Sequence, residues 1–374
     1  MKVLLASHYT LPHRGGIETI IEKLSLGLAT RNHQVRVVSS RVEGQEMFNS
    51  PNRQIIGVRA WDPLRRVGVH YPLFAPSLLL VLFRAVRWAQ VVHVQGMLYQ
   101  NSLLALLLGK LLRRPTVLTE HAGFVPYEQR AFNILQSIFV PILGRFSLWL
   151  SERVIVPDTI VQEILAARFP HFASKIVRIP LGVDTTLFHP VNAIEKQRLR
   201  SELGFDDRPK ILFVGNFVAR KRIPLLVEAL PAECDLILCG EGTPPSNLPP
   251  NVFVYPPQGH AQLAKFYQAA DLFVVPSSVE TFAIAAYEAM ACGLPVIMTQ
   301  DLAHLTIKES GLVIFTPPNA NDLHQTIQDL MQNEQIRTRL GEESAQWVKE
   351  NYSWDAVVNR HIEEYQALLT LKGY

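Results

Sequence analysis

Two glutamates lie eight positions apart in residues 277–296, SSVETFAIAAYEAMACGLPV. Glu280 precedes an apolar, Ala-rich run, and Glu288 lies in its middle. Such a run favours a buried helix, with Thr281 as its predicted N-cap. If all eight residues are helical, the two carboxylates are about 12 Å apart along the axis. A buried carboxylate needs partners, so either both glutamates serve a ligand, or Glu288 meets a core arginine or backbone donor and Glu280 is a solvated cap.

Three other segments carry residues that could help to hold an anionic ligand. Gly15 and Gly16 in HYTLPHRGGIE open an amphipathic helix, where glycines allow close approach and free amides bind anions. Arg220 and Lys221 precede another helical pattern and could clamp a diphosphate. His121 follows the predicted strand in VLTEHAGF. The ordinary alternatives are a tight turn, two surface cations and a structural histidine.

Other site classes lack their sequence patterns. The chain contains no D-x-D pair for a metal–diphosphate site, no G-x-G-x-x-G fingerprint and no P-loop. Its three cysteines form no C-x-x-C pair, which argues against a zinc site and indicates a reducing compartment. We therefore expect neither a metal nor a cofactor.

The elements that must position these residues form two series of strands alternating with helical patterns. Such alternation predicts parallel sheets covered by helices on both faces, and 374 residues are too many for one ordinary core. The sequence thus predicts two doubly wound α/β domains, with residues 179–190 as the linker. The predicted strands are residues 3–6, 35–39, 91–94, 116–119 and 153–156, followed by 211–215, 236–240, 252–255, 272–275 and 295–298.

Charge is distributed unevenly between the two series. Residues 1–190 contain 21 Lys and Arg against 11 Asp and Glu, a net charge of +10, whereas residues 191–374 carry −7. The basic half is expected to meet something anionic. No apolar run reaches the roughly 18 residues that span a bilayer, and the first residues are too short an apolar run for a signal peptide. We expect a cytoplasmic protein without a transmembrane helix.

Together these segments resemble the retaining glycosyltransferases of family 4, which have the GT-B fold. The resemblance covers nearly the whole chain, and its most specific element is the pair Glu280 and Glu288. The chain departs from the family pattern at Asn216, where members often have Arg, at Ala283, where Gly is usual, and at Leu181, where Asn is usual. The segments that carry the resemblance are LPHRGGIETIIEKLSLGL, VVHVQ, TEHAGF, IPLGVDTTLFHP, LFVGNFVARKRIPLLVEAL, ETFAIAAYEAMACGLPVI and NYSWDAVVNRHIEEY.

The resemblance implies a GT-B fold, two facing Rossmann-like domains with a cleft between them. Residues 1–185 would bind the acceptor and would be completed by a C-terminal helix at about 355–374. Residues 190–354 would bind a nucleotide-diphosphate sugar as co-substrate, without a metal. The sugar would be transferred with retention of anomeric configuration.

The resemblance also implies roles for particular residues. The ribose hydroxyls would bind Glu288, and the reacting carbon of the sugar would lie near Glu280 and beside His121, the two candidate catalytic residues. Backbone amides at the start of the helix would reach the sugar and phosphate, and the glycines and cations would hold the leaving diphosphate. The implied donor-binding residues are Gly15, Gly16, Arg220, Lys221, Phe282, Ala283, Ile284 and Glu288.

The acceptor is expected on the basic first domain. Basic and aromatic residues mingle with aliphatic runs in LLLVLFRAVRW and FVPILGRFSLWLSERV, a pattern that suits a membrane interface. This favours a lipid-linked or membrane-associated glycan as acceptor and peripheral contact with the inner face of the cell membrane. A soluble acceptor, another GT-B enzyme such as an epimerase, and a non-catalytic protein that binds nucleotide sugars stay open. Nucleic-acid binding is not expected, because no such motif is present.

Overall fold

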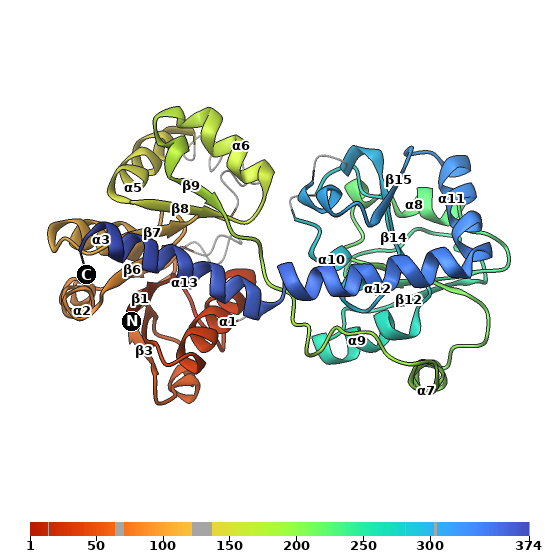
Figure 1. Cartoon of the computed structure of the whole chain (residues 1–374), viewed down its shortest axis with the longest axis horizontal. Helices are drawn as coiled ribbons and strands as arrows, with labels where there is room; N and C mark the ends of the chain where they lie inside the picture. The colour runs from red at the N-terminus through yellow and green to blue at the C-terminus, as the bar shows by residue number, and fades with distance from the viewer. Residues whose placement is uncertain (14, 64–70, 122–136, 281, 303–304, 374) are drawn as a thin grey trace. The chain divides into compact units, whose positions relative to one another are not determined.

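The computed structural model describes residues 1–13, 15–63, 71–121, 137–280, 282–302 and 305–373. The chain divides into two compact units (Figure 1). The first consists of Met1–Leu181 and Val357–Tyr374, and the second of Gly182–Ala356. The sequence places the division within residues 185–190 and at 355, whereas the structure divides the chain after residues 181 and 356.

The first unit contains a seven-stranded parallel sheet in the order β3-β2-β1-β6-β7-β8-β9. All five predicted strands are confirmed, and the sequence missed the two at the edges. A separate antiparallel pair joins β4 (Ala60–Trp61) to β5 (Leu73–Phe74). The strands of the large sheet are β1 (Lys2–Ala6), β2 (Gln34–Ser40), β3 (Arg53–Val58), β6 (Val91–Gln95), β7 (Thr116–Thr119), β8 (Arg153–Val156) and β9 (Ile176–Arg178).

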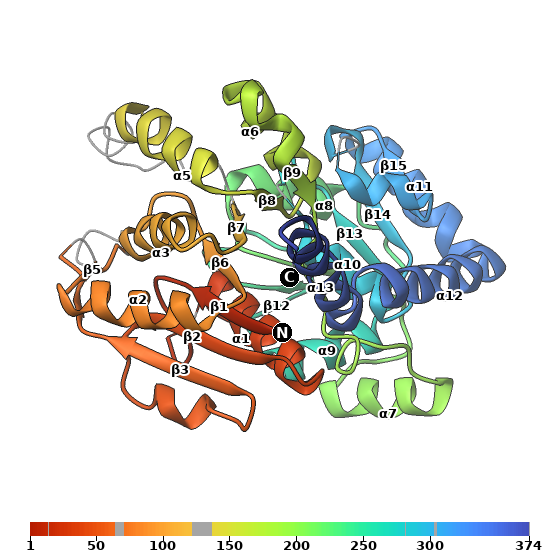
Figure 2. The ribbon, with the colours of Figure 1, turned by 60° about the vertical axis from the view of Figure 1, so that its left-hand side comes forward.

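Helices cover both faces of this sheet, as can be followed in Figure 2. One face packs against α2 (Ser77–Trp88), α3 (Gln100–Leu111), α5 (Arg145–Leu150) and α6 (Thr159–Arg168). The other carries α1 (Gly16–Thr30) and the C-terminal helix α13 (Trp354–Leu371). Successive strand residues point to opposite faces, so Val92 and Val94 join the core beneath α2 and α3, while His93 contacts Tyr365 of α13. Short helical turns are η1 (Gln45–Phe48), η3 (Val140–Gly144) and η4 (Pro170–Lys175).

The second unit contains a six-stranded parallel sheet in the order β12-β11-β10-β13-β14-β15. Its five predicted strands are confirmed, and β15 at one edge was missed. The strands are β10 (Lys210–Val214), β11 (Asp235–Cys239), β12 (Val252–Tyr255), β13 (Leu272–Val275), β14 (Val296–Thr299) and β15 (Val313–Thr316).

The helical elements of this unit are α7 (Ala193–Leu203), η5 (Ala219–Lys221), α8 (Ile223–Glu228), α9 (His260–Ala269), α10 (Ile284–Ala291), η6 (Gln300–Leu302), η7 (Thr306–Ser310), α11 (Ala320–Gln332) and α12 (Glu334–Asn351). The expected linker is largely part of this unit. Val183 pairs with Ser353, and Phe188 packs edge-on against Tyr267. In the described part of the chain, no helix is both long and apolar enough to cross a bilayer.

In each sheet the strand order reverses direction at one place, which is called the topological switch point. In the first sheet this point lies between β1 and β6, and in the second between β10 and β13. In open parallel sheets, ligands bind beyond the carboxyl ends of the strands at this point. The loops that follow β1, β6, β10 and β13 are therefore the places where a site is expected.

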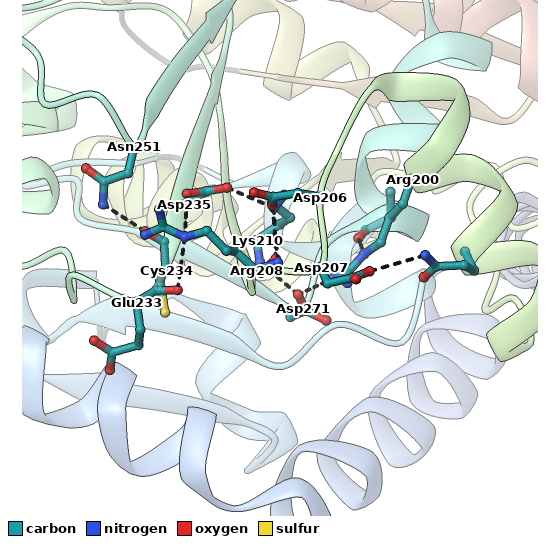
Figure 3. Close-up of polar contacts among 12 residues, drawn as sticks. Arg200, Asp206, Asp207, Arg208, Lys210, Glu233, Cys234, Asp235, Asn251 and Asp271 are labelled. Atoms are coloured by element: carbon teal, nitrogen blue, oxygen red, sulfur yellow. Dashed lines mark hydrogen bonds and ion pairs between the residues drawn. The ribbon is translucent and has the colours of Figure 1, made fainter.

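A dense cluster of charged residues lies at the amino ends of the strands in the second sheet, opposite the carboxyl ends where a ligand is expected (Figure 3). Lys210 begins β10 and is almost fully buried, and its ammonium contacts Asp206 and lies 2.8 Å from the Asp235 carboxylate. The Asp271 carboxylate accepts the Lys210 backbone N–H at 2.8 Å and pairs with Arg200. Because these residues lie at or just before the amino ends of β10, β11 and β13, the cluster stabilises the sheet and is remote from the ligand-binding edge.

Replacing Lys210 with Met is expected to destabilise the second unit by about 3 kcal/mol, since it leaves the buried Asp235 carboxylate without its buried cation. Hydrogen exchange of the β10 and β11 amides would measure this loss as a lower free energy of opening. The matched control is Lys265→Met, because Lys265 forms a surface pair with Glu202 that is worth under about 1 kcal/mol. Equal effects of the two substitutions on the free energy of opening would contradict the stabilising role of Lys210.

Candidate functional site

Hydrogen bonds join the loop after β10 to the loop after β13. The Arg220 carbonyl accepts from the Ser278 backbone N–H at 2.8 Å and from its hydroxyl at 3.2 Å. The Arg220 guanidinium donates to the Val279 carbonyl at 3.2 Å. Since β10 and β13 are neighbours, these bonds hold the two loops together at the ligand-binding edge of the sheet.

The joined loops bring three predicted site residues into contact. Lys221 forms an ion pair with Glu280, and Arg220 Nη1 lies 3.6 Å from the other carboxylate oxygen. The side chains of Glu280 and Lys221 are only 10% and 13% exposed, whereas that of Arg220 is 51% exposed. Glu280 is thus a buried, paired carboxylate, and its interpretation as a solvated cap was wrong. Two cations face one carboxylate, which leaves positive charge for an anionic ligand.

Two glycines permit this arrangement. Gly215 follows β10 with φ +153°, a backbone conformation that residues with a side chain rarely adopt. Gly240 follows β11, and a Cβ on it would come within 1.9 Å of the Gly215 carbonyl oxygen. A side chain at Gly240 would force the two loops apart. Backbone packing at these glycines therefore fixes the path that carries Arg220 and Lys221 to Glu280.

Helix α10 begins later than the sequence predicts. Its N-cap is Ala283, not Thr281, which lies outside the described residues. Glu288 is consequently four residues beyond the first helical residue, Ile284, or about 6 Å along the axis, and the assumption behind the 12 Å separation was wrong. The first amides of an α-helix have no carbonyl partner within the helix. Those of α10 are therefore suited to bind an anion or a hydroxyl oxygen.

Glu288 has a partner that the sequence did not reveal. The Tyr267 hydroxyl, from α9, donates to the Glu288 carboxylate at 3.1 Å. This partner is neither the core arginine nor the backbone donor considered as the ordinary alternative. Burial raises the pKa of Glu288 to about 7, and the hydrogen bond from Tyr267 opposes that rise. A second strong donor, such as a pair of ligand hydroxyls, would stabilise the ionised carboxylate.

In the first unit, His121 follows β7 and contacts the last residue of β6. Its Nε2 atom lies 2.8 Å from Gln95 Oε1. Burial, together with the neighbouring His361, lowers the pKa of His121 to about 4. The imidazole is thus neutral near pH 7. Sequence reasoning missed Gln95, although it stands at the carboxyl end of a predicted strand.

The two glycines before α1 differ in their surroundings. A Cβ on Gly15 would lie 2.2 Å from the carboxylate of Glu18, which is buried and hydrogen-bonded to His13 at 2.8 Å. Gly15 therefore makes room for the chain's own carboxylate, which the sequence-based interpretation did not consider. No atom of the described residues lies within 4 Å of the corresponding point on Gly16. Of the two, Gly16 has the open side that a ligand could approach.

The predicted residues thus form two groups, one in each unit. Arg220, Lys221 and Glu280 meet in the second unit, and α10 starts shortly after Glu280. His121 and the glycine turn lie at the ligand-binding edge of the first sheet. Among the residues that the structure describes, no group of three or more His, Cys, Asp or Glu side chains could hold a metal ion.

Comparison with known proteins decides the family. Residues 14–187 match the family model "Glycosyltransferase Family 4", and residues 195–347 match "Glycosyl transferases group 1". The chain belongs to glycosyltransferase family 4. Among curated relatives, it is 27% identical to the sulfoquinovosyl transferase of Arabidopsis thaliana, over 71% of this chain and 54% of the relative. A phosphatidylinositol N-acetylglucosaminyltransferase subunit of the same plant is 24% identical over 96% of this chain and 80% of its own.

Solved structures identify the fold of this family 4 chain as GT-B. It superposes with a TM-score of 0.75 on Anabaena HepE in complex with UDP, at 16% identity over 98% of this chain and 100% of that one. A sucrose-phosphate synthase from Thermosynechococcus elongatus gives a TM-score of 0.70 at 24% identity, over 99% of each chain. By contrast, this chain covers only 36% to 65% of the length of the first curated relatives that it matches.

The departure from the family 4 pattern at Ala283 has a backbone consequence. Ala283 has φ +51° and ψ +47°, in the left-handed region. A residue with a Cβ pays about 1–2 kcal/mol for this conformation, and glycine does not. The glycine usual at this position is therefore explained by the turn into α10. In this chain the turn persists despite the methyl group, at some cost in stability.

The raised pKa of Glu288 predicts how stability depends on pH. Because the folded pKa of about 7 exceeds the ordinary value of 4.5, the stability due to the protonated form is complete below 4.5 and is lost as pH rises through 7. Relative to Glu288→Gln, the wild type should lose about 2–3 kcal/mol over that range. Hydrogen exchange of the α10 amides would measure it. Parallel pH profiles for the two proteins would contradict the raised pKa.

Proposed function

We propose that this chain is a retaining, metal-independent glycosyltransferase. It moves a sugar from a nucleotide-diphosphate sugar to a lipid-linked or membrane-associated glycan. The observation that carries the proposal is the contact of Arg220 and Lys221 with Glu280 at the switch point of the second sheet. This arrangement suits a ligand with a diphosphate attached to a polyhydroxylated group.

The nucleotide half of the donor is assigned to Glu288. A carboxylate accepts hydrogen bonds from two adjacent hydroxyls, which is what a ribose offers. The Tyr267 hydroxyl holds the carboxylate at one oxygen. The family relationship supports a nucleotide sugar, and the structural neighbour HepE is known in complex with UDP and with UDP-glucose.

The leaving diphosphate is assigned to Arg220, Lys221 and the first amides of α10. Breaking the bond between the sugar and the diphosphate places negative charge on the diphosphate. Two cations and a helix N-terminus stabilise that charge where a metal ion would otherwise be needed. The acceptor hydroxyl attacks from the same face and passes its proton to an oxygen of the leaving diphosphate, and the anomeric configuration is retained. Glu280, held by both cations, lies near the reacting carbon of the sugar.

Slow hydrolysis of one nucleotide sugar, from a panel of UDP-, GDP- and ADP-sugars, is the expected activity without acceptor. EDTA should not change the rate. Lys221→Met should lower kcat by about a hundredfold, because it removes a cation from the leaving group. Lys265→Met, a surface lysine of the same unit, is the control. Loss of activity in EDTA would contradict metal independence, and binding of a donor without turnover would identify a non-catalytic binding protein.

The acceptor proposal rests on the outer surfaces of α2 and α5, which flank α3. Apolar side chains there are exposed: Leu79 and Leu80 by 54% and 53%, and Trp149 by 54%. Exposed arginines accompany them at positions 84, 87 and 145. Exposed aromatic and aliphatic groups beside cations suit an anionic lipid surface. A membrane-associated acceptor would be presented at such a surface.

Binding to vesicles of phosphatidylcholine with phosphatidylglycerol tests this surface. Combined Phe146→Ser and Trp149→Ser substitutions should lower the partition coefficient at least about tenfold, since each ring is worth about 1.5–3 kcal/mol when buried. Trp61→Ser is the control, because Trp61 is 69% exposed on β4 and lies outside this surface. Equal losses would contradict the assignment, and sugar transfer to a water-soluble acceptor without vesicles would favour the alternative of a soluble acceptor.

A further inference from the structure

A chain of hydrogen bonds runs from α13 through the first sheet to His121. The Tyr365 hydroxyl lies 2.6 Å from His93 Nδ1, and Thr119 Oγ1 lies 2.7 Å from His93 Nε2. The Gln95 amide connects the two imidazoles: its Nε2 is 3.2 Å from His93 Nε2, and its Oε1 is 2.8 Å from His121 Nε2. Apart from His121, every residue in this series of hydrogen bonds is buried.

The orientation of the Gln95 amide fixes where the protons are. An amide oxygen can only accept, so His121 carries its proton on Nε2 and donates to Gln95. An amide nitrogen can only donate, so Nε2 of His93 is unprotonated and accepts from Gln95 and Thr119. The proton of His93 is then on Nδ1, where it faces the Tyr365 hydroxyl. One amide thereby sets opposite tautomers in the two histidines.

The surroundings keep these imidazoles neutral. Burial lowers the pKa of His93 well below its ordinary value, and lowers those of His121 and His361 to about 4. His361 faces the group from α13, with its Nδ1 bonded to the Val357 carbonyl at 2.9 Å. Among the described residues, none of the three histidines has a carboxylate partner. The adjacent Glu120 carboxylate instead accepts the Met97 backbone N–H at 2.9 Å.

We propose that Gln95 is a positioning residue that holds His121 in its Nε2–H tautomer, so that the neutral Nδ1 atom accepts a hydrogen bond from a hydroxyl of the bound sugar. The substrate part of this statement rests on the proposed function. His121 is then an acceptor that orients the sugar, and it transfers no proton. Gln95 is well placed for this, because it ends β6 beside the switch point of the first sheet.

Nitrogen NMR of the full chain labelled with ¹⁵N-histidine reads the tautomer without any substrate. The His121 signals, identified by their loss in His121→Phe, should show a protonated Nε2 and an unprotonated Nδ1, with no titration between about pH 5 and 9. In Gln95→Leu they should shift to values averaged between the two tautomers. A protonated Nδ1 in the wild type, or a tautomer that Gln95→Leu leaves unchanged, would overturn the proposal.

Gln95→Glu supplies a second readout if Gln95→Leu fails to fold. A carboxylate still accepts from Nε2–H but stabilises the imidazolium, so the pKa of His121 rises. Protonation of Nδ1 removes its lone pair, and donor hydrolysis should therefore fall as pH drops through the new pKa. At saturating donor, where the ligand is expected to keep Glu288 ionised, the wild-type rate should show no such step over the same pH range. An identical pH profile for Gln95→Glu would contradict the role of His121 as acceptor.

In Gln95→Leu, kcat for donor hydrolysis should fall about 10–100-fold, because a misplaced group costs rate even when the fold is intact. The control is Gln45→Leu, which removes another buried glutamine, near the edge strand β3. Equal losses of kcat in both variants would show that Gln95 has only a structural role. If the wild type hydrolyses no donor at all, the proposed function fails, and the tautomer is still decided by the NMR spectrum.

Discussion

The ion pair between Lys221 and Glu280 holds two loops of the second unit together. It joins loops from the two strands at which the second sheet changes direction, and hydrogen bonds from the Ser278 backbone N–H and hydroxyl to the Arg220 carbonyl reinforce it. Gly240 leaves the space that the loops need, and Gly215 adopts the positive φ of the turn. The pair keeps a cation in place before any ligand arrives, so binding of the proposed diphosphate at this position would cost less in ordering the lysine side chain.

The same design recurs at two half-buried polar groups. Glu288 receives a hydrogen bond from Tyr267, and His121 is held by Gln95. In both cases burial shifts the pKa toward the neutral form, to about 7 for the carboxyl and about 4 for the imidazole. A ligand that donates hydrogen bonds from its hydroxyl groups would stabilise the ionised form of Glu288. The same ligand would find His121 already neutral and able to accept. Both shifts therefore follow from burial of polar groups that have few partners within the chain.

Much of the fold could be predicted, because strands buried on both faces read as continuous apolar runs. The runs LFVV and TVLT coincide with β13 and β7. Strand β3 was missed because it contains polar residues, and β9 because it has only three residues. Strand β15, VIFT, is as apolar as the predicted strands, and its pattern does not explain why it was missed. Residue identity does not reveal the left-handed backbone of Ala283, so the start of α10 was placed too early. Tyr267 and Gln95 were missed because their partners are distant in sequence.

We propose that a nucleotide sugar binds to the joined loops of the second unit. Hydrogen exchange of the full chain, with and without UDP-glucose and GDP-mannose in EDTA, measures this binding. One of these ligands should protect the amides of residues 215–222 and of α10, and the protection should disappear in Lys221→Met. Protection confined to other segments, or binding that Lys221→Met leaves unchanged, would contradict it.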